Sequence, residues 1–160
     1  MSADIDVWRI AAETPDYEAH DLSGKGAEQT GGRWNRKGTP LIYTSVSRAL
    51  ACLETVVHLS SGDALPLNRY LVQIRIPMAL WDSRVGFDPA HHIGWDAEPA
   101  GKVSINWGSA WAHGKATLLA EVPSLIVPEE HNILINPNHA DAAKLTAIKV
   151  RKWTYDPRLN

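Results

Sequence analysis

This sequence has few cysteines and a small net charge, and each property excludes a class of protein. The single cysteine, Cys52, excludes an intramolecular disulfide and a zinc site built from cysteines. The net charge is −2 with histidine neutral, so the basic excess typical of a nucleic-acid-binding protein is missing. We therefore expect no direct contact with nucleic acid.

Long apolar runs are missing as well. No stretch approaches the about 18 uncharged apolar residues of a membrane-spanning helix. The first residues carry two acids, Asp4 and Asp6, and no apolar core, so we expect no signal peptide and a cytoplasmic location. With 160 residues, of which 44% are hydrophobic, residues 1–160 are predicted to form a single domain with a sizeable core.

Several ligand-binding motifs are also absent. The sequence has no Gly-x-Gly-x-x-Gly turn, no P-loop and no His-Glu-x-x-His run. Seven histidines are present, but the adjacent His91 and His92 would point to opposite sides of a strand. We expect neither a metal site nor a permanently bound cofactor.

The hydrophobic periodicity predicts a mixed order of strands and helices. Strands are expected at 7–10, 40–44, 70–76, 125–127, 133–135 and, as an edge strand, 144–153. Helices are expected at about 46–59, capped by Ser45 or Ser47, and within 103–120. Residues 13–32 and 82–101 are expected to be irregular. This order favours an α+β fold over a regular βαβ winding.

Glu54 is the most informative residue of the predicted helix 46–59. It shares the helical spacing i, i+3, i+4, i+7 with Leu50, Leu53 and Val57, which places its carboxylate on the stripe that faces inward. A carboxylate removed from water needs a cation or several hydrogen-bond donors. Glu54 is therefore either a half-buried acid presented into a cleft or a residue at the edge of the stripe that reaches solvent.

Two arginines and two aromatic residues are candidate neighbours of Glu54. Arg33 follows Gly31-Gly32, a turn that brings backbone close to a ligand, and its guanidinium suits phosphate oxygens. Trp34 follows directly and is a candidate for the wall of a ligand site. Tyr43 is either a core residue or a ring that stacks on a planar group, and Arg9 is either exposed or a second cation of the same cleft.

Ser124 and His58 support weaker hypotheses. Ser124 precedes an apolar run, so it serves either a turn or a site, and the glycines of a nucleophile elbow are absent around it. Helical spacing places His58 one turn from Glu54, which allows a nuclease using Arg33, His58 and Glu54. The low net charge argues against that nuclease. A binding module without catalysis is a third hypothesis.

Together these residues resemble the RES-domain family, the toxin half of bacterial Xre–RES toxin–antitoxin pairs. The family is named for Arg, Glu and Ser, which match Arg33, Glu54 and Ser124. The supporting segments run along nearly the whole chain: Trp8-Arg9, Gly32-Arg33-Trp34-Asn35, Pro40-Leu41-Ile42-Tyr43-Thr44-Ser45, Leu53-Glu54, Trp111, Val122-Pro123-Ser124 and Asn132-Ile133-Leu134-Ile135-Asn136-Pro137-x-His139.

The resemblance implies an ADP-ribosyltransferase-like fold, with a split, twisted, mixed β-core, flanking helices and a cleft for NAD⁺ as substrate. It implies cleavage of the bond between nicotinamide and ribose. Glu54 would stabilise the positive charge on the ribose, and Tyr43 would stack on nicotinamide. Arg33, together with Arg9, would hold the pyrophosphate or the adenosine ribose. Ser124 would hydrogen-bond the nicotinamide ribose or support Glu54.

The resemblance also implies partners. The acceptor of ADP-ribose is water or inorganic phosphate, which would deplete NAD⁺, or alternatively a protein side chain. A cognate Xre-type antitoxin would occlude the cleft, and a homodimer within the toxin–antitoxin complex is left open. The sequence itself contains no signal for the acceptor or for the oligomeric state.

Overall fold

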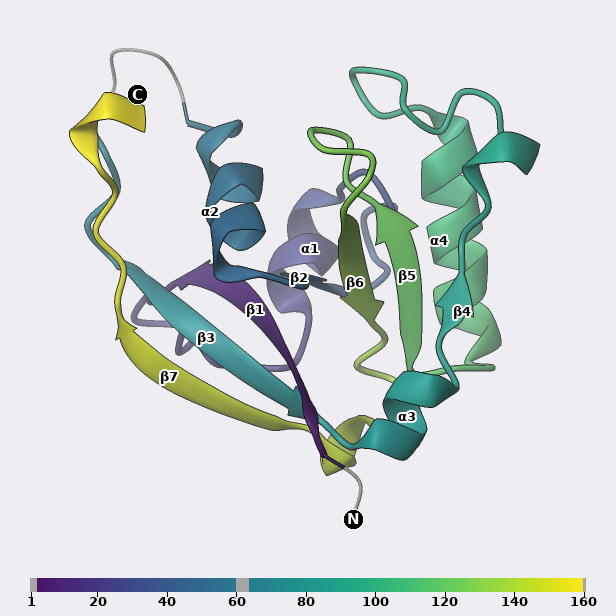
Figure 1. The fold of residues 1–160 in the computed structure, drawn as a ribbon, viewed down its shortest axis with the longest axis horizontal. Helices are drawn as coiled ribbons and strands as arrows, with labels where there is room; N and C mark the ends of the chain where they lie inside the picture. The colour runs from purple at the N-terminus through teal and green to yellow at the C-terminus, as the bar shows by residue number, and fades with distance from the viewer. Residues whose placement is uncertain (1–2, 60–63, 160) are drawn as a thin grey trace.

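A seven-stranded mixed sheet forms the centre of the computed structural model, which describes residues 3–59 and 64–159 (Figure 1). Its strands lie in the order β4 (Val85–Gly86), β5 (Leu119–Pro123), β6 (His131–Ile135), β2 (Ile42–Ser45), β1 (Ile5–Ala12), β3 (Arg69–Ile76) and β7 (Thr146–Lys152). The described residues also form helices α1 (Lys25–Thr30), α2 (Arg48–Val56), α3 (Met78–Asp82) and α4 (Lys102–Gly114). The predicted α+β class is confirmed.

The sheet is almost divided between β1 and β2. These two strands pair at Trp8↔Ser45, whereas β1 and β3 pair along their whole length, from Ile5↔Ile76 to Ala12↔Arg69. One half-sheet therefore holds β1, β3 and β7, and the other holds β2, β6, β5 and β4. Figure 1 shows α2 between the two half-sheets. This division is the split β-core that the family resemblance implies.

Alternating apolar residues build the core. Val72, Ile74 and Ile76 of β3 are fully buried, as the pattern of 70–76 predicts, because every second side chain of a strand points to the same face. They pack with Val7 of β1 and Ile133 of β6, so one apolar cluster spans both half-sheets. Burial of each such side chain stabilises the fold by about 1.5–3 kcal/mol.

Helix α2 is shorter than the predicted helix 46–59. It begins where the Ser47 hydroxyl accepts a hydrogen bond from the Leu50 amide at 3.1 Å, which confirms Ser47 as the cap. Leu50 and Ala51 are its buried residues, whereas Val57 lies beyond the helix end and is 55% exposed. The predicted inward stripe is therefore correct for Leu50 and wrong for Val57.

Three predictions of irregular or extended structure are wrong. Residues 13–32 contain α1, and β4 lies within 82–101. The strand predicted at 125–127 is a turn, because the Ser124 hydroxyl accepts hydrogen bonds from the amides of Ile126 and Val127, at 3.1 Å each. The neighbouring strand is instead β5, which begins at Leu119, inside the segment 103–120 where a helix was expected.

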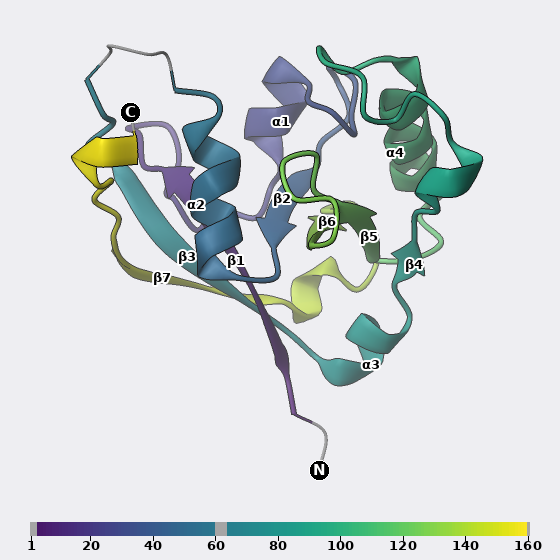
Figure 2. The same ribbon diagram turned by 45° about the horizontal axis from the view of Figure 1, so that its top comes forward.

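The carboxyl-terminal part of the chain returns to α2 (Figure 2). Strand β7 is an edge strand, as predicted. After it, Tyr155 is buried and its hydroxyl lies 2.7 Å from that of Thr55 in α2. This segment therefore holds α2 from the side. No helix in the described residues has the length and apolarity needed to cross a membrane.

Candidate active site

A cavity of about 760 Å³ gathers most of the predicted site residues. It is lined by Arg9 of β1, Arg33, Tyr43 of β2, Glu54 of α2 and Asn132 of β6. This volume lies within the range of about 300–1,000 Å³ that is usual for ligand sites. Because these residues come from both half-sheets and from the helix between them, the site depends on the whole fold.

The carboxylate of Glu54 is half-buried and held at one oxygen. Its Oε1 accepts a hydrogen bond from the Ser124 hydroxyl at 2.7 Å and another from the Asn132 side-chain amide at 2.8 Å. Hydrogen bonds to a charged group are about twice as strong as those between neutral groups. They fix the orientation of the carboxylate while Glu54 still lines the cavity. Of the two readings, half-buried acid and solvated edge residue, the geometry shows the first.

Ser124 lies behind Glu54 and not at the cavity surface. Its side chain is fully buried, and it is absent from the described residues that line the cavity. The hydroxyl receives the amide hydrogens of Ile126 and Val127 and gives its own hydrogen to Glu54. A hydroxyl that accepts two backbone amides has its remaining hydrogen directed at a single partner. This geometry supports Glu54 and leaves no path from Ser124 to a ligand.

The hydroxyl group of Tyr43 is held by two hydrogen bonds. Its hydroxyl donates to Asn35 Oδ1 at 2.6 Å and accepts from the Trp34 amide at 3.0 Å. Burial, which outweighs these bonds and the nearby Arg33 charge, raises the pKa of Tyr43 well above its ordinary value. Tyr43 and Leu41 pack with the same apolar cluster and both line the cavity. A rigid neutral ring at the cavity wall suits stacking on a planar group, which stays a prediction.

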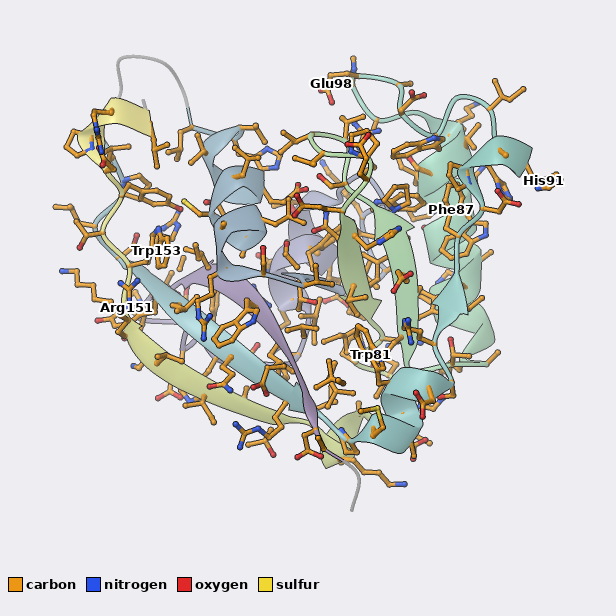
Figure 3. The ribbon with its side chains drawn as sticks, viewed as in Figure 1. Trp81, Phe87, His91, Glu98, Arg151 and Trp153 are labelled. Carbon is orange, nitrogen blue, oxygen red and sulfur yellow. The ribbon has the colours of Figure 1, made fainter. Side chains whose placement is uncertain are left out.

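Arg33 has a role that the sequence did not indicate. Its Nη1 donates to the carbonyls of Trp95 at 3.0 Å and Ala97 at 2.8 Å, and its Nη2 forms an ion pair with Glu98 at 2.8 Å. The Arg33 side chain is 14% exposed. Figure 3 shows Glu98 at the top edge of the molecule, on the loop that precedes α4. Arg33 thus binds this loop to the cavity wall, and only part of its donor set remains for a ligand.

Arg9 lines the cavity and forms no salt bridge among residues 3–59 and 64–159, although Asp21 of the same cavity lies near it. Its pKa is lowered, because burial outweighs the opposing effects of Asp21 and Tyr17. A guanidinium withdrawn from water without a paired carboxylate is costly and favours an incoming anion. Arg9 therefore lies where a second cation of the cleft is expected, and its role toward a ligand stays a prediction.

Trp34 belongs mainly to the core. It lines the cavity but is only 2% exposed, and its ring packs edge-on against Phe87 and Trp107 at centroid distances of 4.8 and 5.8 Å. Figure 3 places Phe87 in the interior, near α4. Helix α4 lies so close that a Cβ added at Gly108 would be 1.9 Å from the Trp34 carbonyl oxygen. Trp34 therefore anchors the turn that carries Arg33.

Sequence reasoning missed three residues of the site. Asn132 and Asn35 stand within segments that carry the family resemblance, which was the available signal, but their contacts were not predictable. Asn35 is buried, and its amide donates to the carbonyls of Ala27 at 2.8 Å and Thr39 at 2.9 Å, which fixes α1 and the 32–39 turn. Glu98 has no sequence signal, because its partner Arg33 is 65 residues away.

A second cavity of about 210 Å³ adjoins the first. Both are lined by Arg9, Tyr43, Glu54, His58 and Asn132, so Glu54 lies at their common wall. His58 is exposed there, on the turn that follows the end of α2, so the predicted helix 46–59 does not reach it. Among the described residues, no group of three or more His, Cys, Asp or Glu side chains is placed to hold a metal ion.

Comparison with known proteins identifies relatives over almost the whole chain. A family model described as the RES domain matches residues 6–158. A protein from Sphingobium sp. named Prs ADP-ribosylating toxin is 60% identical over 153 residues, which cover 95% of this chain and 94% of that protein. Toxin Res from Yersinia enterocolitica is 36% identical over 147 residues, 89% of this chain and 93% of that protein. Toxin Res from Pseudomonas putida is 34% identical over 154 residues, covering 96% and 98%.

Proposed function

The chain belongs to the RES domain family, and on this basis we propose that it is a toxin that uses NAD⁺ to ADP-ribosylate a protein. The bond between nicotinamide and the ribose C1 breaks, nicotinamide leaves with the bonding electrons, and an acceptor side chain forms the new bond to C1 and loses a proton. Water or phosphate can replace the side chain as acceptor.

The observation that carries this proposal is the fixed carboxylate of Glu54 at the cavity wall. Loss of nicotinamide passes through a ribose with oxocarbenium character, and an oriented carboxylate stabilises such a charge by its field and by hydrogen bonds to the ribose hydroxyls. Ser124 and Asn132 hold Oε1 of Glu54 at 2.7 and 2.8 Å, so the carboxylate does not have to reorient as the charge develops.

The other cavity residues fit the remaining parts of NAD⁺. Arg9, a half-buried cation that lines the cavity, suits the pyrophosphate. Arg33 holds the loop that carries Glu98 against the adjacent cavity wall. Its remaining N–H groups can donate to the pyrophosphate oxygens. The fixed ring of Tyr43 suits stacking on nicotinamide.

The relatives' names decide which acceptor comes first in this proposal. The family resemblance placed water or phosphate first, with a protein as the alternative, whereas the relative at 60% identity is named for ADP-ribosylating Prs. We therefore place the protein acceptor first and take Prs as its candidate target. A toxin that consumes NAD⁺ in its own cell requires an inhibitor, so an Xre-type antitoxin that covers the cavity, and a cytoplasmic location, belong to the same proposal.

Product analysis distinguishes the acceptors. The protein is incubated with NAD⁺ alone, with phosphate and with Prs, and the products are weighed by mass spectrometry. Prs that gains one ADP-ribose unit is the expected result. Free ADP-ribose or ADP-ribose 1″-phosphate as the main product would replace the protein acceptor by water or phosphate. A parallel incubation with RNA tests the nuclease alternative, and NAD⁺ bound without turnover would indicate a binding module.

A further inference from the structure

The two oxygens of the Glu54 carboxylate have different surroundings. Oε1 accepts hydrogen bonds from both Ser124 and Asn132, while Oε2 accepts none from the residues that the structure describes. A carboxylate that is saturated at one oxygen presents the other to whatever occupies the cavity. The donors on Oε1 therefore determine where Oε2 points.

Asn132 is held in one orientation by Ser45. The Ser45 hydroxyl donates to Asn132 Oδ1 at 2.7 Å, which directs the Nδ2 amide of Asn132 toward Glu54. If the amide were turned over, its oxygen would face the carboxylate, and two acceptors would repel each other in a site of low dielectric. The Ser45 hydroxyl is thus the first member of a hydrogen-bonded chain that runs from Ser45 through Asn132 to Glu54.

Ser45 lies where the two half-sheets meet. Ser45 pairs with Asn132 of β6 on one side and with Trp8 of β1 on the other. The pair Trp8↔Ser45 is the register contact through which the two half-sheets meet in the described residues. The residue at that junction is therefore the one that orients Asn132. Both Ser45 and Asn132 also line the smaller cavity beside Glu54.

We propose that Asn132, oriented by Ser45, is a positioning residue that aims Oε2 of Glu54 at the ribose hydroxyls of NAD⁺. The proposal rests on the function proposed above and adds to it a specific source of preorganisation. Asn132 acts through Glu54, so its loss should lower the rate of the chemical step and leave substrate binding nearly unchanged.

Kinetics of nicotinamide release test this role. Asn132→Ala should lower kcat by about 10- to 100-fold, the range for a hydrogen bond to a charged group, with KM changed by less than about threefold. Ser45→Ala should lower kcat less, and Ser45→Thr, which keeps the hydroxyl, should recover most of the loss. A fall in binding at unchanged kcat would overturn the proposal.

Asn136→Ala is the matched control. Asn136 follows the same strand, is more deeply buried than Asn132, and donates to the Ala112 carbonyl at 2.8 Å, far from Glu54 in sequence and contact. Its loss should reduce the free energy of unfolding and leave kcat within about twofold, because surface and core changes away from the site act on stability. Equal effects of Asn132→Ala and Asn136→Ala on kcat would show a general structural role and overturn the inference.

A double-mutant cycle with Glu54→Gln makes the test specific. If Asn132 acts through Glu54, Asn132→Ala should cost almost nothing further in the Glu54→Gln background, whereas independent effects would multiply. Multiplying effects overturn the inference. A wild type that releases no nicotinamide overturns the proposed function itself. The positioning role alone is overturned if Glu54→Gln lowers the rate of nicotinamide release below that of the wild type and Asn132→Ala does not.

Discussion

The Ser124 hydroxyl donates to Glu54 Oε1 at 2.7 Å, although 70 residues separate the two in the sequence. The same hydroxyl is tied to the turn after β5 by two backbone amides. The carboxylate on α2 is therefore oriented by the turn that follows β5, in the half-sheet that holds β2, β6, β5 and β4. Two of the three residues for which the family is named form a single hydrogen-bonded unit in this protein.

Removal of the Ser124 hydroxyl should slow the reaction. Ser124→Ala is expected to lower kcat for nicotinamide release by about tenfold and to change KM little, since the hydroxyl holds Glu54 and does not reach the cavity. Ser104→Ala is the control, because Ser104 is equally buried and its hydroxyl has no partner in the described residues. A raised KM with normal kcat would show instead that Ser124 binds the ribose.

The two arginines of the cavity should differ in their effects. Arg9→Gln is expected to weaken binding of ADP-ribose by about 10- to 100-fold in calorimetry, because it removes a half-buried cation of the cavity that forms no salt bridge among the described residues. Arg33→Gln should weaken binding too, but it should also lower the melting temperature, since it releases the loop at Trp95, Ala97 and Glu98. Unchanged affinity in Arg9→Gln would remove Arg9 from the site.

Helix α4 offers a pair of glycines for a packing test. At Gly108 an added Cβ would be 1.9 Å from the Trp34 carbonyl oxygen, whereas at Gly114 it would meet nothing within 4 Å. Gly108→Ala should reduce the free energy of unfolding by at least about 3 kcal/mol, because backbone must move to accept the methyl group. Gly114→Ala should leave it unchanged or raise it by up to about 1 kcal/mol. Equal values in urea unfolding would contradict this close contact.

Tyr43 should make stability depend on alkaline pH. Its folded pKa is raised, so the fold favours the protonated phenol, and this contribution is fully present below the unfolded pKa of about 10 and is lost as the pH rises above it. Tyr43→Phe loses the bonds to Asn35 and Trp34 and should be less stable by about 2 kcal/mol at neutral pH. The difference between the two proteins should shrink above about pH 10 in urea unfolding. A difference that stays constant with pH would contradict the burial of the phenol.

Local patterns predicted the fold where one periodicity dominated. Val72, Ile74 and Ile76 alternate, so β3 was predictable, and Ser47 marked the start of α2. Strand β5 was not, because its first residues lie in the segment 103–120, where Trp107 and Trp111 at helical spacing favoured a helix. The strand ends where the Ser124 side chain accepts hydrogen bonds from backbone amides. The hydrophobic periodicity of the sequence does not predict such bonds.

The site was predictable as a set of residues and not as a set of contacts. Glu54 and Arg33 carry chemical signals in their residue types and in their neighbours. The partners that fix them, Asn132 and Glu98, lie 78 and 65 residues away, and nothing local links such pairs. The contact of Arg33 with Glu98 was not predictable for this reason, and the role of Arg33 toward the pyrophosphate or the adenosine ribose stays a prediction.

The central claim is that the carboxylate of Glu54 drives the loss of nicotinamide. The direct test is the rate of nicotinamide release by Glu54→Gln, with ADP-ribose affinity measured in the same sample to show that the cavity is intact. We expect kcat to fall by at least about 100-fold while ADP-ribose still binds. Release at the wild-type rate by a variant that binds ADP-ribose normally would contradict the account.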